Sequence, residues 1–537
     1  MEHKKNVLLI TEGTYPYMGG GVSTWAHHLT QRITGYDFSI YSLNADVVDE
    51  PKFVLGSSVK EVLQVPMWAP EEPYDCVDYN QKYSQILLRR ERTNAAVIIN
   101  RFLPHFKKFL AYTFFPETTQ DDAEQSGLLE AFQRMWSFFE VYDYKTTMVS
   151  EQVWSCFKNN LIAHWPKQEM AGVKLMDLTM ALRLLFRYLI PLAIKVPKSD
   201  VSHLTIAGIG IIPALKQKQQ FGNPIILTEH GVFIRERMIA ISNTDYSQFL
   251  KKVLIRFSEA MTRLTYAQSD KIISVSKFNV IWEQRYGADV SRIQVIYNGV
   301  DHQLFAPQED STKKERPTVV AAARIFELKD ILTMIKTCAY VKKTIPNVHF
   351  LVYGDKTAVP DYTQSCEAMI AKLGVKANFS LAGYHDTPSA LFHEGDISIL
   401  TSISEGFPFT VIESMSCGIP IVATDVGGVA EAIEDGVTGF ICKPKDHKSL
   451  GKRVVQLLDD VKLREQMGAN ARNKVLESFT IEKFTESFSN AYAEVLDTPK
   501  LKSLKKKDKG KKNKKDKKGS KDRKKKQKKS TKSVQTI

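Results

Sequence analysis

The chain has 537 residues, of which 43% are hydrophobic and 25% charged, a composition that excludes a disordered protein and allows two or three globular domains. Its formal net charge of +14 is unevenly distributed, because residues 500–537 carry 20 Lys and Arg against three Asp, which leaves −3 for the other 499 residues. Six cysteines without paired spacing argue against a zinc site or a disulfide framework and favour a reducing compartment.

The beginning of the chain predicts a strand rather than a targeting segment. Its apolar stretch VLLI is far too short for the hydrophobic region of a signal peptide. The best candidate for a membrane span, residues 180–196, is interrupted by Arg183, Arg187 and Lys195, and it therefore predicts a buried or amphipathic helix. We expect a cytoplasmic protein, with peripheral attachment to the inner face of the plasma membrane as an open alternative.

A glycine-rich loop follows the first predicted strand, KNVLLIT. In EGTYPYMGGGVSTWAHHL, Gly19, Gly20 and Gly21 lead into a helix that is expected to begin near Val22. Glycines permit a close approach between backbone and ligand, so Gly20 and Gly21 are predicted to cradle a phosphate or to hold an acceptor. An ordinary connection between a strand and a helix is the alternative.

The first domain is predicted to span residues 1–302, with a helical insertion at about 54–198. The insertion is rich in aromatics at helical spacing, as in LLEAFQRMWSFFEVYDY, which indicates core packing more than an acceptor groove. Strand patterns return in HLTIAGIG, PIILTEHG, KIISVSK and IQVIYNG. His230 stands at the end of one of these strands, in LTEHG, and the charged segment at 235–237 either borders an acceptor or forms an exposed cluster.

A polar linker, residues 306–317, leads to a second domain at residues 318–480. Its strands TVVAAARI, HFLVYGD, FSLAG, ISILT and PIVAT alternate with helical stretches, which predicts a parallel sheet with right-handed crossovers. An amphipathic helix at 481–498 is expected to cross back onto the first domain, and the tail at 500–537 has too few apolar residues to fold. The predicted class is therefore α/β, with two Rossmann-like domains.

Two cations follow the first strand of the second domain. Arg324 ends TVVAAAR, and Lys329 comes five residues later in RIFELKD, just before a helix. A nucleoside diphosphate gains negative charge as it leaves, so fixed cations at its oxygens stabilise the transition state more than the ground state. Such a pair usually belongs to a solvated face, but its place in the domain favours phosphate binding.

Two carboxylates, Glu405 and Glu413, flank a predicted turn between strand and helix in SISEGFPFTVIESMSCGIPIVATDVGG. The loop SEGFP follows a buried parallel strand, at the edge where open α/β sheets bind ligands. A helix that begins near Pro408 would present unpaired N–H groups to a diphosphate. Glu413 lies roughly 7 Å along it, at a rise of ~1.5 Å per residue, and can reach ribose hydroxyls. Alternatively, both carboxylates merely favour the helix dipole.

This segment, together with the later loop DGVTGF, resembles the paired-glutamate motif of retaining nucleotide-sugar glycosyltransferases of family 4, which have the GT-B fold. The resemblance implies that Glu413 binds ribose and that Glu405 faces hydroxyls of the donor sugar. It also implies that Arg324 and Lys329 bind the donor phosphates and that His230 lies near the reacting carbon. The remaining donor contacts that it implies are Gly383 and Tyr384 at the nucleobase and the turn made by Gly406, Phe407, Pro408, Phe409 and Thr410.

Two other phrases, EGTYPYMGGGVSTWAHHL and LTEHGVFIRER, resemble a narrower subgroup, the glycosyltransferases of Pel-type exopolysaccharide synthesis. By contrast, RIFELKD and GGVAEAIEDGVTGF resemble the general family, which leaves the transferred sugar open. The expected function is transfer of a hexosyl unit from a UDP-sugar to a glycan or lipid-linked hydroxyl acceptor. The resemblance further implies that the anomeric configuration is retained and that the product belongs to an exopolysaccharide or another cell-surface glycan.

Three alternatives stay open. They are a phosphorylase or sucrose-synthase-like enzyme on the same fold, a non-catalytic sugar-nucleotide-binding subunit of a polysaccharide synthase complex, and a nucleic-acid-binding protein driven by its tail. The tail lacks aromatics for base stacking, so we expect it to stay solvated or to bind anionic lipid headgroups or a synthase complex. No cofactor and no obligatory metal are expected, because cations and a helix N-terminus can replace a divalent ion.

Overall fold

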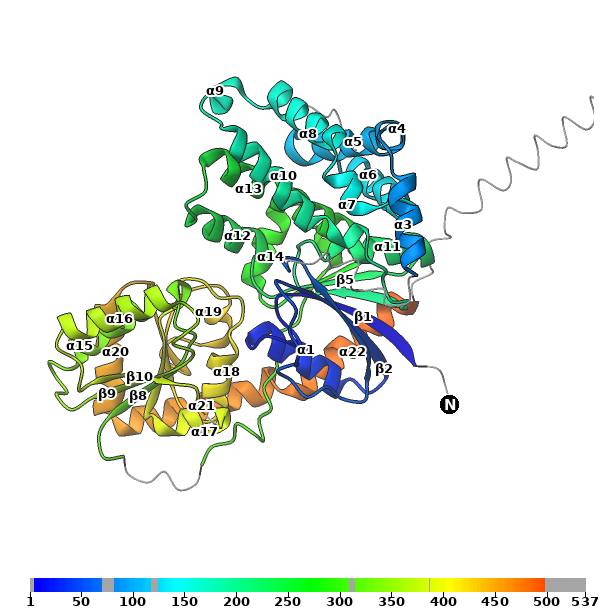
Figure 1. The fold of residues 1–537 in the computed structure, drawn as a ribbon. Helices are drawn as coiled ribbons and strands as arrows, with labels where there is room; N and C mark the ends of the chain where they lie inside the picture. Colours follow the sequence, from blue (N-terminus) through cyan, green and yellow to red (C-terminus); the bar gives the residue numbers. More distant parts are fainter. Residues whose placement is uncertain (1–3, 70–81, 117–123, 309–313, 386, 498–537) are drawn as a thin grey trace, which may run out of the picture.

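Two parallel β-sheets, each covered by helices on both faces, form the two domains of this protein (Figure 1). The structure is a computed structural model and describes residues 4–69, 82–116, 124–308, 314–385 and 387–497. Within these ranges the predicted α/β class with two parallel-sheet domains is confirmed. The tail predicted at 500–537 lies outside the described residues, as does Cys76.

The first sheet has seven strands among the described residues, in the order β3-β2-β1-β4-β5-β6-β7. All neighbouring strands are parallel. The strands are β1 (Lys5–Glu12), β2 (Tyr36–Asn44), β3 (Val59–Pro66), β4 (Val201–Leu204), β5 (Ile225–Glu229), β6 (Lys271–Ser274) and β7 (Ile293–Val295). The chain turns back between β1 and β4, which makes this pair the topological switch point, the place where open α/β sheets bind ligands.

Side chains of β1 alternate between two hydrophobic cores, as a strand buried on both faces requires. Val7 and Leu9 pack against helix α1, whereas Leu8 and Ile10 pack against a large helical layer on the opposite face (Figure 1). The helical elements of the first domain are α1 (Gly21–Arg32), α3 (Tyr83–Arg92), α4 (Ala95–Val97), η1 (Ile98–Phe102), α5 (Leu103–Phe114), α6 (Glu124–Phe139), α7 (Tyr144–Met148), α8 (Glu151–His164), α9 (Lys167–Met170), α10 (Leu175–Tyr188), η3 (Ile190–Leu192), α11 (Ile211–Phe221), α12 (Phe233–Ser242), α13 (Gln248–Gln268), α14 (Lys277–Arg285) and η4 (Val290–Arg292).

The insertion expected at about 54–198 needs a correction at its beginning. Residues 59–66 form the edge strand β3, which pairs in parallel with β2, and the first helix of this region among the described residues begins at Tyr83. The sequence VKEVLQVP has three valines, which favour a strand, but its apolar residues do not alternate regularly, so the signal was weak beside the aromatic helices. Most of the aromatic side chains in these helices are buried in the core, as expected. Helix α10 covers much of the membrane-span candidate, and it buries one face through Leu178, Ala181, Leu184 and Leu185.

The second sheet has six strands among the described residues, in the order β10-β9-β8-β11-β12-β13, and its switch point lies between β8 and β11. Its strands are β8 (Thr318–Ala322), β9 (His349–Tyr353), β10 (Phe379–Gly383), β11 (Ile397–Leu400), β12 (Ile421–Thr424) and β13 (Gly439–Cys442). Its helical elements are η5 (Glu327–Lys329), α15 (Ile331–Val341), α16 (Pro360–Lys372), α17 (Pro388–Leu391), η6 (Phe392–Glu394), α18 (Phe409–Ser416), α19 (Val429–Ala432), α20 (His447–Asp459) and α21 (Val461–Ser478).

The last described helix, α22 (Ile481–Asp497), returns from the second domain to the first (Figure 1). Its apolar side chains, among them Phe488 and Tyr492, join the core formed by α1 and the first sheet. The two chain crossings lie side by side, because Val300 and Thr480 form a parallel bridge. No helix within the described ranges combines the length and the apolar character that spanning a bilayer requires.

Candidate functional site

The switch point of the second sheet brings together a lysine and a glutamate that are far apart in the sequence. Lys329 Nζ lies 2.5 Å from Glu405 Oε1, and both side chains are largely buried. Asp330, at φ 44°, turns the chain sharply after Lys329, and the Lys329 carbonyl accepts a hydrogen bond from the Thr401 hydroxyl at 2.9 Å. A cation and a carboxylate are therefore held together at the ligand-binding edge of this sheet.

The loop that carries Glu405 is packed backbone against backbone on its neighbours. A Cβ atom added to Gly406 would lie 1.7 Å from the carbonyl oxygen of His230, in the first domain. A Cβ atom on Gly427, which has φ +58°, would lie 1.8 Å from the Glu405 carbonyl oxygen. Asn298 donates a hydrogen bond of 2.7 Å to the Phe407 carbonyl. Asn298 thus holds the predicted donor loop in place.

The first residues of helices α18 and α1 meet at the domain interface. Helix α18 begins at Phe409 behind Pro408, and α1 begins at Gly21 behind Gly20; no side chain caps either of them. A Cβ atom added to Gly21 would lie 3.5 Å from the Phe409 ring. Uncapped N–H groups and two positive helix ends thus converge, an arrangement that favours an anion.

Glu413 lies in the second turn of α18, and its side-chain carboxyl group receives no hydrogen bond from any described residue. Its side chain is only partly exposed, and the resulting desolvation raises its pKa to about 7. An unpaired carboxyl group in such a place is well suited to accept hydrogen bonds from a ligand.

Gly383 and Tyr384 follow β10 at the outer part of the same edge. Gly383 has φ +83°, and its carbonyl accepts a hydrogen bond of 2.7 Å from the Gly354 N–H group. The Tyr384 ring is 68% exposed, its hydroxyl donates to Asp355 at 3.4 Å, and Lys52 from the first domain lies over the ring at 5.2 Å. An exposed aromatic ring is thus available to a planar group.

Arg324 follows β8 at the same edge of the sheet. Its guanidinium group is 5.4 Å from the Phe326 ring. Hydrogen bonds from Thr357 lower the pKa of Asp355 most, and the charge of Arg324 lowers it further. Of the two predicted cations, Lys329 is the one that bonds Glu405.

His230 directly follows β5 in the first domain, and its imidazole packs on Trp25 at a ring distance of 4.5 Å. Burial lowers its pKa to about 3, so the ring is neutral at physiological pH. No described residue bonds its buried Nε2 atom. The structure places its backbone carbonyl against Gly406, which joins His230 to the Glu405 loop.

Helix α12, directly after His230, carries the charged segment at 235–237 along the domain interface. Arg235 donates a hydrogen bond of 3.1 Å to the Ser404 hydroxyl in the second domain. Desolvation raises the pKa of Glu236, the nearby Glu405 carboxylate raises it further, and Arg235 and Lys329 lower it. The sequence left these residues between an acceptor border and an exposed cluster, and the structure places Arg235 and Glu236 beside the Glu405 loop, whereas Arg237 bonds Tyr188 of the first domain.

Sequence reasoning missed two residues of the first domain at this interface, Glu12 and Lys52. Glu12 ends β1 at the switch point, where it accepts a hydrogen bond of 2.7 Å from the Gly210 N–H group. Its position directly after the first predicted strand was the available signal. Lys52 lies in a loop with no recognisable pattern, so only the tertiary structure reveals it.

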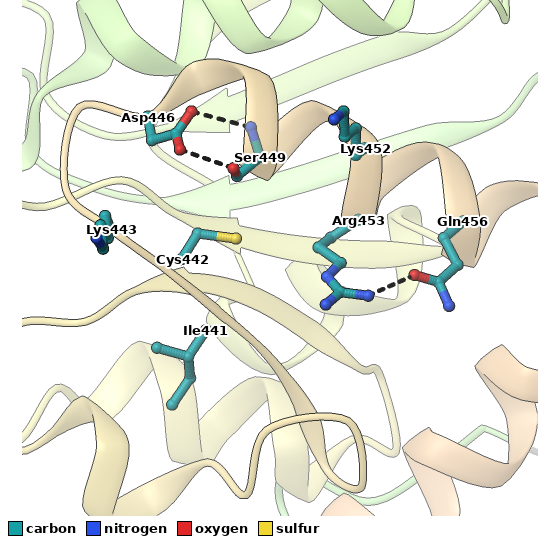
Figure 2. Close-up of a pocket in the computed structure, with 8 residues that line it drawn as sticks. All are labelled: Ile441, Cys442, Lys443, Asp446, Ser449, Lys452, Arg453 and Gln456. Atoms are coloured by element: carbon teal, nitrogen blue, oxygen red, sulfur yellow. Dashed lines mark hydrogen bonds between the residues drawn. The ribbon is translucent and has the colours of Figure 1, made fainter.

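A pocket of about 540 Å³ between β13 and α20 does not belong to this site (Figure 2). Its polar groups bond one another, because Asp446 accepts hydrogen bonds from the N–H and hydroxyl groups of Ser449, and Arg453 donates to Gln456. Its lining residues are Ile441, Cys442, Lys443, Asp446, Ser449, Lys452, Arg453 and Gln456. None of the residues predicted for the site is among them.

Two parallel-sheet domains whose switch points face each other define the GT-B class of glycosyltransferases. Residues 5–291, more than half of the chain, match the family described as "Domain of unknown function (DUF3492)", and residues 304–474 match "Glycosyl transferases group 1". The chain belongs to this family of group 1 glycosyltransferases with an N-terminal DUF3492 domain.

Known proteins resemble the chain over most of its length. The N-acetyl-alpha-D-glucosaminyl L-malate synthase of Bacillus anthracis is 26% identical over 301 residues, which cover 55% of this chain and 75% of that protein. The crystal structure of HepE from Anabaena in complex with UDP-glucose matches with a TM-score of 0.55 at 13% identity, over 91% of this chain and all of that one. Sucrose-phosphate synthase from Thermosynechococcus elongatus matches with a TM-score of 0.58 at 15% identity, over 92% of this chain and all of that one. The GT-B fold is confirmed by these likenesses.

Proposed function

We propose that this protein transfers a hexosyl unit from a UDP-sugar to a hydroxyl group of a glycan or lipid-linked acceptor, with retention of the anomeric configuration. The observation that carries the proposal is the Lys329–Glu405 pair at the switch point of the second sheet, beside the uncapped start of α18. Lys329 and the helix N–H groups suit the diphosphate, whereas Glu405 and Glu413 suit hydroxyls of the sugar and the ribose.

The proposed step conserves charge and atoms. The bond between the anomeric carbon of the sugar and the β-phosphate oxygen of UDP breaks, and the electron pair stays with UDP. The acceptor oxygen forms a new bond to the same face of that carbon, and its proton passes to the departing phosphate oxygen. Lys329 stabilises the negative charge that develops on this oxygen. His230 is neutral, so its ring in the first domain does not compete with Lys329 as a second positive charge.

We propose that no metal ion is obligatory. The positive charge needed at the diphosphate is supplied by Lys329, by Arg324 and by the beginnings of α1 and α18. In the part of the chain that the structure describes, no group of three or more His, Cys, Asp or Glu side chains is arranged to hold a metal.

A UDP-release assay tests the proposal. Full-length protein is incubated with UDP-glucose, UDP-galactose and their N-acetyl forms, with and without oligosaccharide acceptors, in buffer containing EDTA. We expect UDP release from at least one donor, retention of configuration by NMR of the product, and a loss of about 100-fold or more in kcat/KM for Glu405→Gln. Glu367→Gln, an exposed glutamate on α16, is the matched control and should retain wild-type activity.

The outcomes separate the alternatives. UDP binding without release by the wild-type protein would indicate a non-catalytic subunit, and turnover that requires inorganic phosphate would indicate a phosphorylase. Undiminished turnover of Glu405→Gln would remove Glu405 from the donor site. Activity that EDTA abolishes and Mg²⁺ restores would overturn the proposal on metals.

The biological role that we propose is synthesis of an exopolysaccharide or another cell-surface glycan at the cytoplasmic side of the membrane. Relatives support this setting by their names, such as the UDP-Gal:alpha-D-GlcNAc-diphosphoundecaprenol alpha-1,3-galactosyltransferase of Escherichia coli, 22% identical over 315 residues. The lysines of residues 500–537 provide charge for anionic lipids or for a synthase complex. Sedimentation of the full chain with phosphatidylglycerol vesicles, compared with a chain ending at residue 499, tests the contact with lipid.

A further inference from the structure

The first domain has a carboxyl group at its own switch point that the donor chemistry does not use. Glu12 ends β1, and the loop after the neighbouring strand β4 passes directly beneath it. A Cβ atom added to Gly208 would lie 2.6 Å from one oxygen of Glu12 and 2.8 Å from the other, so a larger residue at this position would require the carboxyl group to move. One oxygen of Glu12 accepts from the Gly210 N–H group, and no described residue bonds the second oxygen.

A guanidinium group faces this carboxyl without touching it. Burial raises the pKa of Glu12 to about 7, whereas the Gly210 N–H group and then the charge of Arg237, on α12, lower it, and Glu12 and Arg237 form no direct ion pair. The Arg237 guanidinium group donates a hydrogen bond of 3.2 Å to the Tyr188 hydroxyl and keeps further N–H groups. A hydroxyl group between Glu12 and Arg237 can donate to the carboxyl and accept from the guanidinium at once.

An aromatic side chain extends this surface. The Trp68 indole is 44% exposed and packs edge-on against the Tyr188 ring, with 5.8 Å between ring centroids and an angle of 89°. Arg187 donates hydrogen bonds to the carbonyl groups of Met67 and Ala69, on both sides of Trp68, at 3.5 and 3.3 Å. The exposed ring is therefore held in place although it follows the edge strand β3.

Helix α12 connects this surface to the donor site. Arg235 bonds Ser404 beside Glu405, and Arg237, two residues later, faces Glu12. The two side chains leave opposite sides of the helix, so the second link to the donor site is the loop after Glu12, which leads into α1, where Gly21 lies against the Phe409 ring of α18. We therefore place the ligand on the side of the first domain that adjoins the donor site. Convergent polar groups beside an exposed aromatic ring fit a carbohydrate, whose ring has an apolar face and a rim of hydroxyls.

We propose that Glu12, Arg237, Tyr188 and Trp68 form a subsite for a sugar ring of the acceptor, with the ring on Trp68 and a hydroxyl between Glu12 and Arg237. The proposal rests on the proposed function and names its acceptor class: the acceptor is a glycan, whose sugar ring occupies this face of the first domain. An acceptor without a sugar ring, such as a simple polyol, makes only the polar contacts.

Steady-state UDP release tests the subsite, with chitotetraose, maltotetraose and glycerol as acceptor probes. We expect at least one tetrasaccharide, and not glycerol, to accelerate UDP release above the donor hydrolysis seen without acceptor. Trp68→Ala should raise KM for the tetrasaccharide about tenfold, and Trp68→Phe should restore most of the affinity because it keeps a ring. Glu12→Gln, which preserves the shape of the side chain, should lower kcat/KM for the tetrasaccharide about tenfold. In all three variants the KM for the donor should change less than about twofold.

Phe221→Ala is the matched control, because Phe221 is exposed to a similar extent, 41%, but precedes β5 at the opposite end of the sheet. Donor hydrolysis that neither tetrasaccharide accelerates would overturn the subsite while sparing the proposed function. The subsite also fails if Trp68→Ala leaves the tetrasaccharide KM unchanged, or if glycerol accelerates release as well as a tetrasaccharide does. Absence of any UDP release or UDP binding by the wild-type protein would instead refute the proposed function.

Discussion

Glu413 illustrates how one residue can set the pH dependence of this site. Burial raises its pKa to about 7, so the uncharged form predominates below that pH and the carboxylate above it. Hydrogen bonds from ribose hydroxyls favour the carboxylate, because an ionised acceptor forms the stronger bonds. We therefore expect UDP to bind more tightly as the pH rises from about 6 to about 8, and the Glu413→Gln protein to lose this pH dependence. Isothermal titration calorimetry across this range measures it.

The folding stability of the ligand-free protein should change with pH in the direction opposite to UDP affinity, falling as the pH rises. A carboxyl whose pKa is raised by folding contributes stability below its unfolded pKa, and that contribution is lost as the pH rises through about 7. At pH 8 the ligand-free Glu413→Gln protein should thus be more stable than wild type by about 1–2 kcal/mol, less than the full shift implies because the side chain is partly exposed. Urea unfolding at pH 5 and pH 8 provides the comparison. A variant that is weaker in binding UDP but no more stable at pH 8 would contradict this account of Glu413.

At the scale of structural elements, the loop between β11 and α18 requires a glycine at position 406. The reason is a close contact with another backbone and not a left-handed backbone conformation. At Gly406 a methyl group would meet the His230 carbonyl oxygen at 1.7 Å, and neither backbone can rotate away. We expect Gly406→Ala to separate the domains locally and to lower kcat about 100-fold or more, because catalysis needs groups from both domains at near-contact distance. UDP affinity should fall much less, since the proposed donor contacts lie mainly on the second domain.

Gly35→Ala is the control for this substitution, because a Cβ atom on Gly35 has no heavy atom within 4 Å. Small-angle X-ray scattering and UDP-release kinetics report the separation of the domains and the loss of turnover. If Gly406→Ala retains wild-type kcat, the contact with His230 has no part in catalysis.

At the scale of the whole molecule, α22 makes the stability of the first domain depend on side chains near the end of the described chain. Phe488 is 1% exposed and packs on Trp25, and Tyr492 bonds the buried His203 at 2.7 Å. Phe488→Ala should reduce the free energy of unfolding of the first domain by about 3–5 kcal/mol through the cavity that it leaves. Hydrogen exchange should show this loss in the first sheet, while the second sheet retains its protection.

Phe350→Ala, in the core of the second sheet, should produce the reverse pattern. Equal losses of protection in both sheets for both variants would mean that the two domains unfold as one cooperative unit. In that case α22 would couple the stability of the domains as well as connect them in space.

Much of the site was predictable from local pattern. The strands, the start of α18 at Phe409 and the spacing of Glu405 and Glu413 depend on residues close in sequence, whose periodicity and turn chemistry act over a few positions. The edge strand β3 was missed because the aromatic helices after it dominate that stretch of sequence.

Sequence by itself determined which side chains stand at the carboxyl ends of the strands, because alternation and glycine placement set the ends of each element. Tertiary structure alone decided which of them meet. Lys329 bonds Glu405 across 76 positions of the sequence. The charge of Arg237, on the helix after β5, acts on Glu12 at the end of β1 only because the fold brings these two segments close together. His230 is neutral only because burial, with Trp25 packed against its ring, removes water from it. Such contacts and protonation states depend on strand order and burial, which no short stretch of sequence encodes.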